Sequence, residues 1–404
     1  MACSRSDRIS SMKWYSAVSE NIVLIEAFKE CTSSLQQEVF DSTDLVIAFV
    51  GSDFSESYDL LPKLVNDQFP NAVLLGCSGN GIIGDGREIE QRPGLALTFA
   101  SMPGVFISPF HLMDKDLPDG DDSPQKWESL IEVQASSHPD FVILSDPFSM
   151  RVQNLISGLD YAYPGSTVIG GISSGGSQPG TNALYLNDQY ITEGIVGISL
   201  SGDVQIDTIV AQGCKPVGSP MRVSKCDRNI LEQMDGNKPF DVLTEIYSSL
   251  SEKDQSLFQN SLFLGVVMDP FEETPGIGDF LIRNVIGADQ EKGLISVGEM
   301  LREGQIVQFH LRDSQTSIEN LGEMLDHYTE QETVDGTGAL LFSCLGRGSY
   351  LYGTADHDTN LFKDKVGEIP LTGFFCNGEI GPVRDTTYIH GYTSAFGIVG
   401  PQKK

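Results

Sequence analysis

Two short polar segments near the C-terminus carry the residues best suited to chemistry in this 404-residue chain. Arg347 lies between two glycines in the segment SCLGRG (residues 343–348), so its guanidinium fork is open to a carboxylate or a phosphate. Asn377 and Glu379 follow Cys376 in the segment CNGE, where they offer amide and carboxylate partners for an ammonium or hydroxyl group. We predict that these side chains contact a ligand; the alternative is that they only cap turns.

The thiols of Cys344 and Cys376 could act as nucleophiles or as ligand contacts, because each lies at the end of an apolar run. A reactive thiolate also needs a base or a positive charge nearby. His390 is the nearest histidine after Cys376, which gives little support for such a pair. We therefore predict no catalytic residue and keep a cysteine-dependent enzyme as an alternative.

Three glycine-rich motifs are incomplete. Gly79-x-Gly81-x-x-Gly84 has the spacing of a dinucleotide fingerprint, but the following DGREIEQRPG does not predict the helix that would bind a pyrophosphate. Read as a phosphate loop, the same region has two isoleucines where Lys and Ser/Thr are needed. The segment GISSG (residues 171–175) lacks the helix of a nucleophile elbow. We therefore predict no cofactor.

The six histidines are scattered and include no HxxxH or HExxH pair, so we predict no metal site. The acidic segment 114–122 resembles a calcium loop but lacks the glutamate that the twelfth position requires. His310 shares one face of an expected strand with Arg312. We count His310 as a candidate ligand contact, although a hydrogen-bonded structural histidine fits equally well.

The elements that must position these residues occur in three similar copies. Each copy is expected to contain a strand, a helix and a second strand that ends at a glycine, with another glycine five residues later. The glycine pairs, and the small polar residue before each second glycine, are Gly76/Gly81 with Asn80, Gly170/Gly175 with Ser174, and Gly373/Gly378 with Asn377. If the copies pack together, their turns lie near each other, which adds Ser78, Asn80 and Ser174 to the candidate ligand contacts. The alternative is that the glycines only allow positive φ at tight turns.

Apolar periodicity predicts the remaining elements. Strands are expected at 45–50, 72–76, 261–268, 280–286 and 305–311, and helices over 60–69 and from residue 239. The runs 95–100 and 105–110 are predicted to form a hairpin, and Thr316 and Glu319 to form a helix capping box. The predicted fold class is α/β, with repeated strand–helix–strand units and hairpins forming mixed sheets flanked by helices, in two related modules.

Composition excludes several classes of protein. The chain has 26 Lys and Arg against 56 Asp and Glu, a net charge of −30, which disfavours nucleic acid and anionic membranes as partners. No apolar run is long enough for a transmembrane helix or a signal peptide. The seven cysteines are scattered and odd in number, without a CxxC, so a reducing cytoplasm is the expected location.

Several long segments resemble the FIST (F-box and intracellular signal transduction) proteins, especially the stand-alone cyanobacterial and plant-type members. The most distinctive segments are LLGCSGNGIIG, YPGSTVIGGISSGG, GALLFSCLGRGSYLYG and PLTGFFCNGEIGPV. The resemblance covers nearly the whole chain from Met12 onward. It predicts an N-terminal extension with a first helix over 1–40, a FIST N-type domain over 41–212, a connecting segment over 213–239 and a FIST C-type domain over 240–400.

The resemblance implies an intracellular sensory module that binds an amino acid or a similar small polar metabolite. It also implies a signalling or ubiquitin-pathway partner protein, because eukaryotic relatives can follow an F-box. Only about 40 residues precede the first expected strand, which is too few for an F-box with its linker. A protein-binding adaptor therefore stays as an alternative function.

Overall fold

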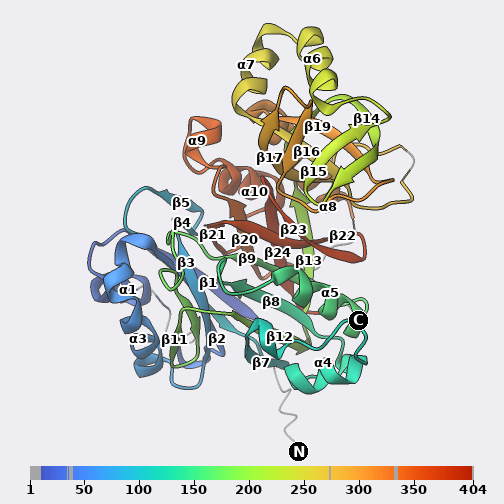
Figure 1. The fold of residues 1–404 in the computed structure, drawn as a ribbon. Coiled ribbons are helices and arrows are strands. Elements are labelled where there is room, and N and C mark those ends of the chain that lie inside the picture. The colour runs from blue at the N-terminus through green and yellow to red at the C-terminus, as the bar shows by residue number, and fades with distance from the viewer. Residues whose placement is uncertain (1–10, 34, 36–39, 273, 332–334, 403–404) are drawn as a thin grey trace, which may run out of the picture. The chain divides into compact units, whose positions relative to one another are not determined.

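The computed structural model describes residues 11–33, 35, 40–272, 274–331 and 335–402, and they form two compact units (Figure 1). Unit 1 combines three stretches of the chain, Met1–Val210, Leu325–Ile389 and Ser394–Lys404. Unit 2 consists of Ala211–Met324 and His390–Thr393. Unit 1 is therefore discontinuous in sequence, and most of unit 2 is inserted between two of its stretches.

Three six-stranded sheets make up the described part of unit 1, and their strands follow the same order. Each sheet has a central parallel pair, two antiparallel strands on one side and a two-stranded hairpin on the other. The first sheet is β1 (Lys13–Ser19), β6 (Leu95–Ser101), β2 (Leu45–Gly51), β3 (Val73–Gly79), β10 (Leu184–Leu186) and β11 (Gln189–Ile191). The second is β7 (Val105–Leu112), β12 (Ile195–Gly202), β8 (Asp140–Ser145), β9 (Val168–Ile172), β22 (Gly378–Val383) and β23 (Thr386–His390). The third is β13 (Gln205–Ala211), β24 (Ser394–Gly400), β20 (Gly338–Cys344), β21 (Leu371–Cys376), β4 (Gly81–Gly84) and β5 (Arg87–Glu90).

The hairpin that follows each parallel pair joins a different sheet, and the exchange is cyclic. Hairpin β4–β5 follows β3 but pairs with β21, hairpin β10–β11 follows β9 but pairs with β3, and hairpin β22–β23 follows β21 but pairs with β9. The predicted α/β class, the mixed sheets and the three-copy repeat are confirmed by this topology. The exchange interlocks the copies, because none of the three sheets is complete without strands from another copy.

The repeat glycines serve a different purpose from the one expected. Gly76, Gly170 and Gly373 lie within β3, β9 and β21 rather than at their ends, so that part of the prediction is wrong. A Cβ at each position would overlap the carbonyl oxygen of the facing residue on the parallel neighbour strand. Among the six repeat glycines only Gly175, with φ of 99°, has a positive φ. Close approach of two strands, not turn geometry, therefore requires the first glycine of each pair.

The predicted hairpin over 95–110 is wrong. β6 pairs with β1 and β2 of the first sheet, whereas β7 pairs with β12 of the second. The chain crosses between sheets at Gly104, whose φ is 84°. Local turn signals cannot distinguish a hairpin from a crossing, because both reverse the chain within a few residues.

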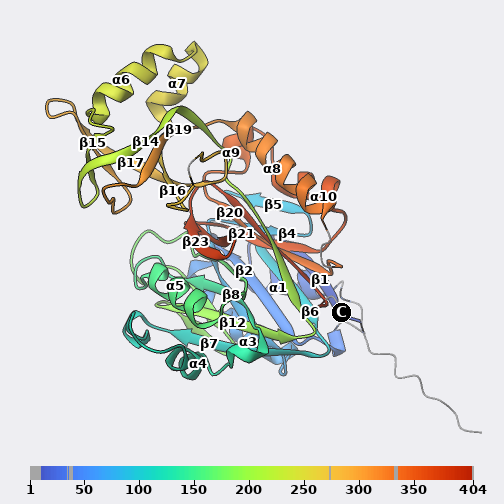
Figure 2. The ribbon, with the colours of Figure 1, turned by 90° about the vertical axis from the view of Figure 1, so that its right-hand side faces the viewer.

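The inner faces of the three sheets enclose one core, and helices cover their outer faces (Figures 1 and 2). α1 (Leu24–Ser33), the 3-10 helix η1 (Ser52–Leu60) and α3 (Leu61–Gln68) cover the first sheet. α4 (Pro124–Ile131) and α5 (Val152–Ala162) cover the second, beside the short 3-10 helices η2 (Asp114–Asp116) and η3 (Ala135–Ser137). α9 (Ser349–Tyr352) follows β20, and α10 (His357–Val366) packs on the third sheet, where Phe362 stacks on Phe396.

Unit 2 contains a closed six-stranded barrel with α6 (Pro239–Ser249) and α7 (Glu252–Asn260) packed on it. The barrel order is β14 (Cys214–Asp227), β15 (Ile230–Met234), β18 (Leu294–Val297), β17 (Phe280–Asp289), β16 (Leu262–Val267) and β19 (Ile306–Arg312). The sequence expected only a connecting segment over 213–239, where the structure has β14 and β15.

Helix α8 (Ser314–Glu330) leads from unit 2 back into unit 1. Its first turn is capped by Asp313, whose Oδ2 accepts from the backbone N of Thr316 at 3.1 Å. The capping box predicted at Thr316 and Glu319 is therefore wrong, because the helix begins before Thr316. Leu321, Leu325 and Tyr328 form the buried face of the helix.

Candidate functional site

The structure brings the three glycine-rich turns together, as the repeat predicted. The hydroxyl of Ser78 donates to the carbonyl of Ser174 at 3.0 Å, and the backbone N of Ser174 donates to the carbonyl of Ser78 at 3.2 Å. The backbone N of Asn377 donates to the carbonyl of Ile172 at 3.0 Å. The second and third copies are thus joined in the same way as the first and second.

The third link of this ring passes through a side chain. The hydroxyl of Ser174 accepts from the backbone N of Asn80 at 2.9 Å and donates to the carbonyl of Phe375 at 2.5 Å. Ser174 is fully buried and its hydroxyl is committed to this bridge, whereas Asn80 and Asn377 are exposed at its edge. Ser78 and Ser174 therefore hold the junction together, and the two asparagines are its accessible polar groups.

Cys376 and Glu379 point into the core enclosed by the sheets. The Cys376 thiol donates to the carbonyl of Ser343 at 3.3 Å, and burial raises its pKa well above the usual range. A neutral thiol is a poor nucleophile. Glu379 is fully buried and lies opposite Gly171, whose Cβ position faces the Cys376 sulfur. Neither side chain reaches the surface of unit 1.

Arg347 is fully buried and paired with a carboxylate of its own chain. Its Nε donates to Asp358 Oδ2 at 2.8 Å, and its Nη2 to Asp358 Oδ1 at 3.3 Å. Burial by itself would raise the pKa of Asp358, but the guanidinium and several hydrogen bonds hold it well below the usual range. Cys344 is half-buried one turn earlier, where its carbonyl accepts from the backbone N of Arg347 at 2.8 Å. The guanidinium thus faces Asp358 of α10, while its Nη1 is buried without a hydrogen-bond partner among the described residues.

His310 belongs to unit 2 and lies inside β19 of the barrel. Its Nδ1 lies 3.0 Å from the carbonyl of Gln308, and its ring packs edge-on against Phe280. Burial lowers the pKa of His310 to about 4, so the ring is neutral at physiological pH. This environment matches the structural histidine that the sequence left open.

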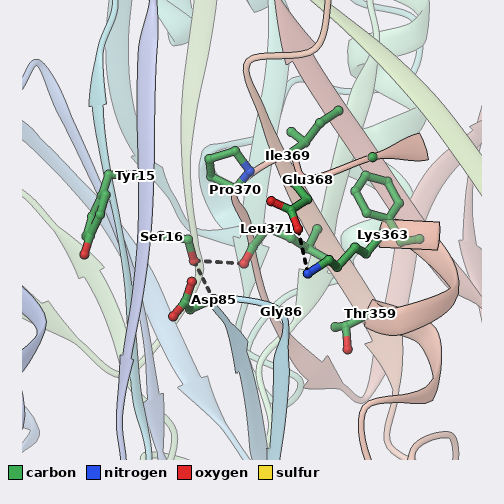
Figure 3. Close-up of a pocket in the computed structure, with 12 residues that line it drawn as sticks. Tyr15, Ser16, Asp85, Gly86, Thr359, Lys363, Glu368, Ile369, Pro370 and Leu371 are labelled. Atoms are coloured by element: carbon green, nitrogen blue, oxygen red, sulfur yellow. Dashed lines mark hydrogen bonds and ion pairs between the residues drawn. The ribbon is translucent and has the colours of Figure 1, made fainter. Parts of the chain in front are cut away.

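A cavity of about 320 Å³ opens in unit 1 where three elements meet (Figure 3). Strand β1 and the turn between β4 and β5 line one side, and α10 with the segment that leads into β21 lines the other. The Ser16 hydroxyl accepts from the backbone N of Asp85 and donates to the carbonyl of Leu371, both at 2.9 Å. Ser16 therefore fixes the turn and the strand on either side of the cavity.

Opposite charges lie on the two sides of this cavity. Figure 3 shows Asp85 beside Ser16 on one side, and on the other Lys363, which pairs with Glu368 at 2.8 Å. Partial burial raises the pKa of Asp85, and the charges of Arg87 and Lys363 partly offset that rise. Phe362, Ile369 and Leu371 supply apolar lining. The cavity therefore offers the carboxylates of Asp85 and Glu368, the ammonium group of Lys363 and an apolar wall.

Sequence reasoning missed this cavity, because its residues come from segments more than 250 positions apart. A turn signal was present at Asp85-Gly86, but nothing in the sequence pairs that turn with Lys363. In the part of the chain that the structure describes, no group of three His, Cys, Asp or Glu residues is arranged to hold a metal ion. No described helix has both the length and the apolar character needed to cross a bilayer.

Comparison with known protein families shows to which family this chain belongs. The FIST N domain model matches residues 44–237, and the FIST C domain model matches residues 239–382. The chain belongs to the FIST family. Two uncharacterized mycobacterial proteins are similar over most of their length: one of Mycobacterium tuberculosis is 33% identical over 377 residues, and one of Mycobacterium bovis is 32% identical over 378. Both alignments cover 92% of this chain and 95% of the relative.

More distant matches are also found. An F-box/LRR-repeat protein of Arabidopsis thaliana is 21% identical over 464 residues, covering 97% of this chain and 86% of that protein. Among solved structures, a cyanuric acid hydrolase of A. caulinodans matches with a TM-score of 0.36 at 8% identity, covering 98% of this chain and 99% of that one. A chorismatase matches with a TM-score of 0.31 at 10% identity, covering 97% of this chain and 99% of that one.

The two FIST models do not coincide with the two structural units. The boundary between the models, at residues 237–239, falls inside unit 2. Unit 1 therefore contains strands from both matched ranges. The cavity of Figure 3 is also lined by residues of both, because Asp85 lies in the FIST N match and Lys363 in the FIST C match.

Proposed function

We propose that this FIST protein is a cytoplasmic sensory module that binds a small polar metabolite in the cavity of Figure 3. The observation that carries the proposal is the placement of Asp85 and Lys363 on opposite sides of one open cavity. A volume of about 320 Å³ lies at the lower end of the range for small-molecule sites, about 300–1,000 Å³. FIST domains are regarded as signal-transduction sensors, which agrees with a ligand site of this size.

A zwitterion such as a free amino acid fits the charges best. Its ammonium would lie against Asp85 and its carboxylate against Lys363, with its side chain on Phe362 and Ile369. Glu368 is an exposed partner of Lys363. Exposed ion pairs contribute only about 0–1 kcal/mol, so a ligand carboxylate can replace Glu368 at little cost.

Such a ligand would connect the FIST N and FIST C parts of unit 1. The turn that carries Asp85 follows the first copy of the repeat, and Lys363 belongs to the third. A bound zwitterion would pull the two sides together, and a partner protein could then distinguish the bound from the free state. This coupling is the step by which we propose that binding becomes a signal.

Isothermal titration of the purified chain with the free amino acids and with small organic anions tests the proposal. We expect one zwitterion to bind, and Lys363→Met and Asp85→Asn each to weaken it by about tenfold or more, which is about 1.4 kcal/mol. The matched controls are Lys365→Met and Asp364→Asn on the same helix, because neither residue lines the cavity. If the controls lose as much affinity as the variants, the ligand does not bind in this cavity.

Further variants in the same titration separate the cavity from the three-turn junction. Asn80 and Asn377 are the exposed polar groups there, so Asn80→Ala and Asn377→Ala should leave the affinity unchanged. If only these two variants lose binding, the ligand binds at the junction. If no compound binds the wild-type chain, the sensory proposal is wrong.

The likeness to the Arabidopsis F-box/LRR-repeat protein favours a second candidate, a protein-binding adaptor in signalling or ubiquitin transfer. The adaptor predicts a stoichiometric partner whose capture does not change with added metabolite or with Lys363→Met. If the chain is a sensor, added metabolite and Lys363→Met should each change the amount of partner that is captured.

A further inference from the structure

Two helices of unit 1 are capped by acidic residues of strand β5 instead of by their own sequence. Glu88 Oε1 accepts from the backbone N of Thr359, in the first turn of α10, at 3.0 Å. The backbone N of Glu88 donates in return to Asp356 Oδ1 at 2.6 Å, so strand and helix are joined reciprocally. Glu90 Oε1 accepts from the backbone N of Ser349, the first residue of α9, at 2.8 Å.

The cap from Glu88 acts on the wall of the cavity. Thr359 lines the cavity, as do Phe362 and Lys363 one turn later on the same helix. The first turn of a helix has backbone N–H groups without an intrahelical acceptor. Asp356, the residue before α10, makes no side-chain cap of its own. Glu88 therefore supplies an acceptor that fixes the helix start and, with it, the position of Lys363.

Charged groups surround Glu88. Its side chain is buried, and Oε2 has no hydrogen-bond partner among the described residues. Burial, together with the nearby charges of Asp358, Glu90 and Asp356, raises its pKa to about 8, and the hydrogen bond from the backbone N of Thr359 offsets only part of that rise. The nearby donors are committed to Asp358: Arg347 pairs with that carboxylate, and His357 Nδ1 lies 3.0 Å from its Oδ1. Tyr352, the other titratable group near Glu88, has its pKa raised beyond the physiological range, chiefly by burial.

We propose that Glu88 is a positioning residue of the ligand cavity, which in its neutral form caps α10 and holds the helix wall in the binding geometry. This inference rests on the proposed ligand site. Ionisation would strengthen the bond from Thr359, but burial and the repulsion of three other carboxylates outweigh that gain, so ionised Glu88 is drawn out toward water. The bond to Thr359 is then lost, and the wall that carries Lys363 loosens. Binding of the ligand is therefore coupled to retention of one proton by Glu88.

The sign of the pH effect follows from the direction of the shift. The pKa of Glu88 is higher in the folded chain than in the unfolded chain, so its stabilising effect is complete at acid pH. That effect is lost as the pH rises through about 8. At about pH 8.5 roughly a quarter of Glu88 is neutral, so affinity should be about fourfold weaker than at about pH 6.5.

Titration of the zwitterion found above, at both pH values, tests the coupling with two matched variants. Glu88→Gln keeps the acceptor without a charge, and we expect its affinity to stay within about twofold across this range. Glu90→Gln changes the other acidic cap of β5, on a helix that contributes nothing to the cavity. It should still lose affinity as the pH rises, with the midpoint at a lower pH, because the charge of Glu90 no longer raises the pKa of Glu88. If wild-type and Glu88→Gln proteins lose affinity equally, the titrating group is not Glu88 and the inference is wrong.

Hydrogen exchange along α10 measures the cap without any ligand. After correction for the intrinsic effect of pH, wild-type protection at residues 357–366 should fall about fourfold between the same two pH values, and Glu88→Gln should stay flat. If protection changes as expected but no compound binds the wild-type chain, the sensory proposal is overturned and the capping role of Glu88 stands. Flat protection in both proteins would overturn the positioning role, whether or not a ligand binds.

Discussion

At the scale of single residues, polar side chains in unit 1 have structural roles that cannot be deduced from their residue types. Ser174 completes a hydrogen-bonded ring between three turns, and Arg347 neutralises a buried carboxylate. Both were candidate ligand contacts on chemical grounds, because hydroxyl and guanidinium groups suit ligands as well as structure. The identity of the partner decides which role applies, and the partner is set by tertiary contacts.

Ser174→Ala should destabilise unit 1. The variant leaves the backbone N of Asn80 and the carbonyl of Phe375 without the hydroxyl that joins them. Losing the partner of a buried polar group costs about 1–3 kcal/mol, so we expect a decrease of that size in the free energy of unfolding, measured with denaturant. Ser177→Ala, at an exposed position in the same segment, is the control. A change no larger than that of the control would show that the bridge is dispensable.

At the scale of elements, helix α10 is attached to unit 1 by its N-terminal half. Its first turn is bonded to β5 through Glu88, Asp358 pairs with Arg347, and Phe362 stacks on Phe396 of β24 at a centroid distance of 5.0 Å. Ser394 of β24 also donates to Asp358, at 2.6 Å. The helix therefore joins β5, β24 and the turn after β20, and at the same time forms one wall of the cavity of Figure 3.

Arg347→Met should weaken this attachment strongly. The change leaves Asp358 as a buried charge without its guanidinium partner, and removing one partner of a buried ion pair costs about 3–5 kcal/mol. Denaturant unfolding should show a loss of that order. The double variant Arg347→Met with Asp358→Leu should recover part of the loss, because an apolar pair leaves no buried charge. A double variant no more stable than Arg347→Met would contradict this account.

At the scale of the whole molecule, unit 1 is assembled from both FIST modules. The FIST N match ends at residue 237, before the three strands β20, β21 and β24 that the third sheet needs. The second sheet likewise takes β22 and β23 from the C-terminal part. The cyclic exchange of hairpins means that neither module contains a complete set of three sheets.

A chain truncated after residue 237 should therefore fail to fold cooperatively. Its first sheet would be complete. The core side chains of the first and second sheets, such as Phe49 and Leu144, would however be exposed, because Phe342 and Phe374 of the third sheet belong to the same core and would be missing. We expect thermal unfolding followed by near-ultraviolet circular dichroism to show no cooperative transition, in contrast with the full chain. Adding residues 325–404 as a separate fragment should restore part of the signal. A cooperative transition of the truncated chain alone would contradict the interlocked architecture.

The sequence by itself determined the local elements and their repetition. Apolar runs such as Leu45–Gly51 predict buried strands because the pattern is carried by neighbouring residues. The α/β class, the three copies and the meeting of their turns followed from that pattern, and motif resemblance identified the family correctly. Glycine spacing marked the repeat, although the reason for the glycines was misjudged.

Only the tertiary structure decided which strands pair and which side chains meet. β6 and β7 are consecutive in sequence yet belong to different sheets, and Glu88 caps a helix 271 residues away. Such pairings depend on how whole sheets pack around a common core, and no local pattern records that. The cavity of Figure 3 also depends on such pairings, because Asp85 and Lys363 lie on opposite sides of it only after the first and third copies have exchanged strands.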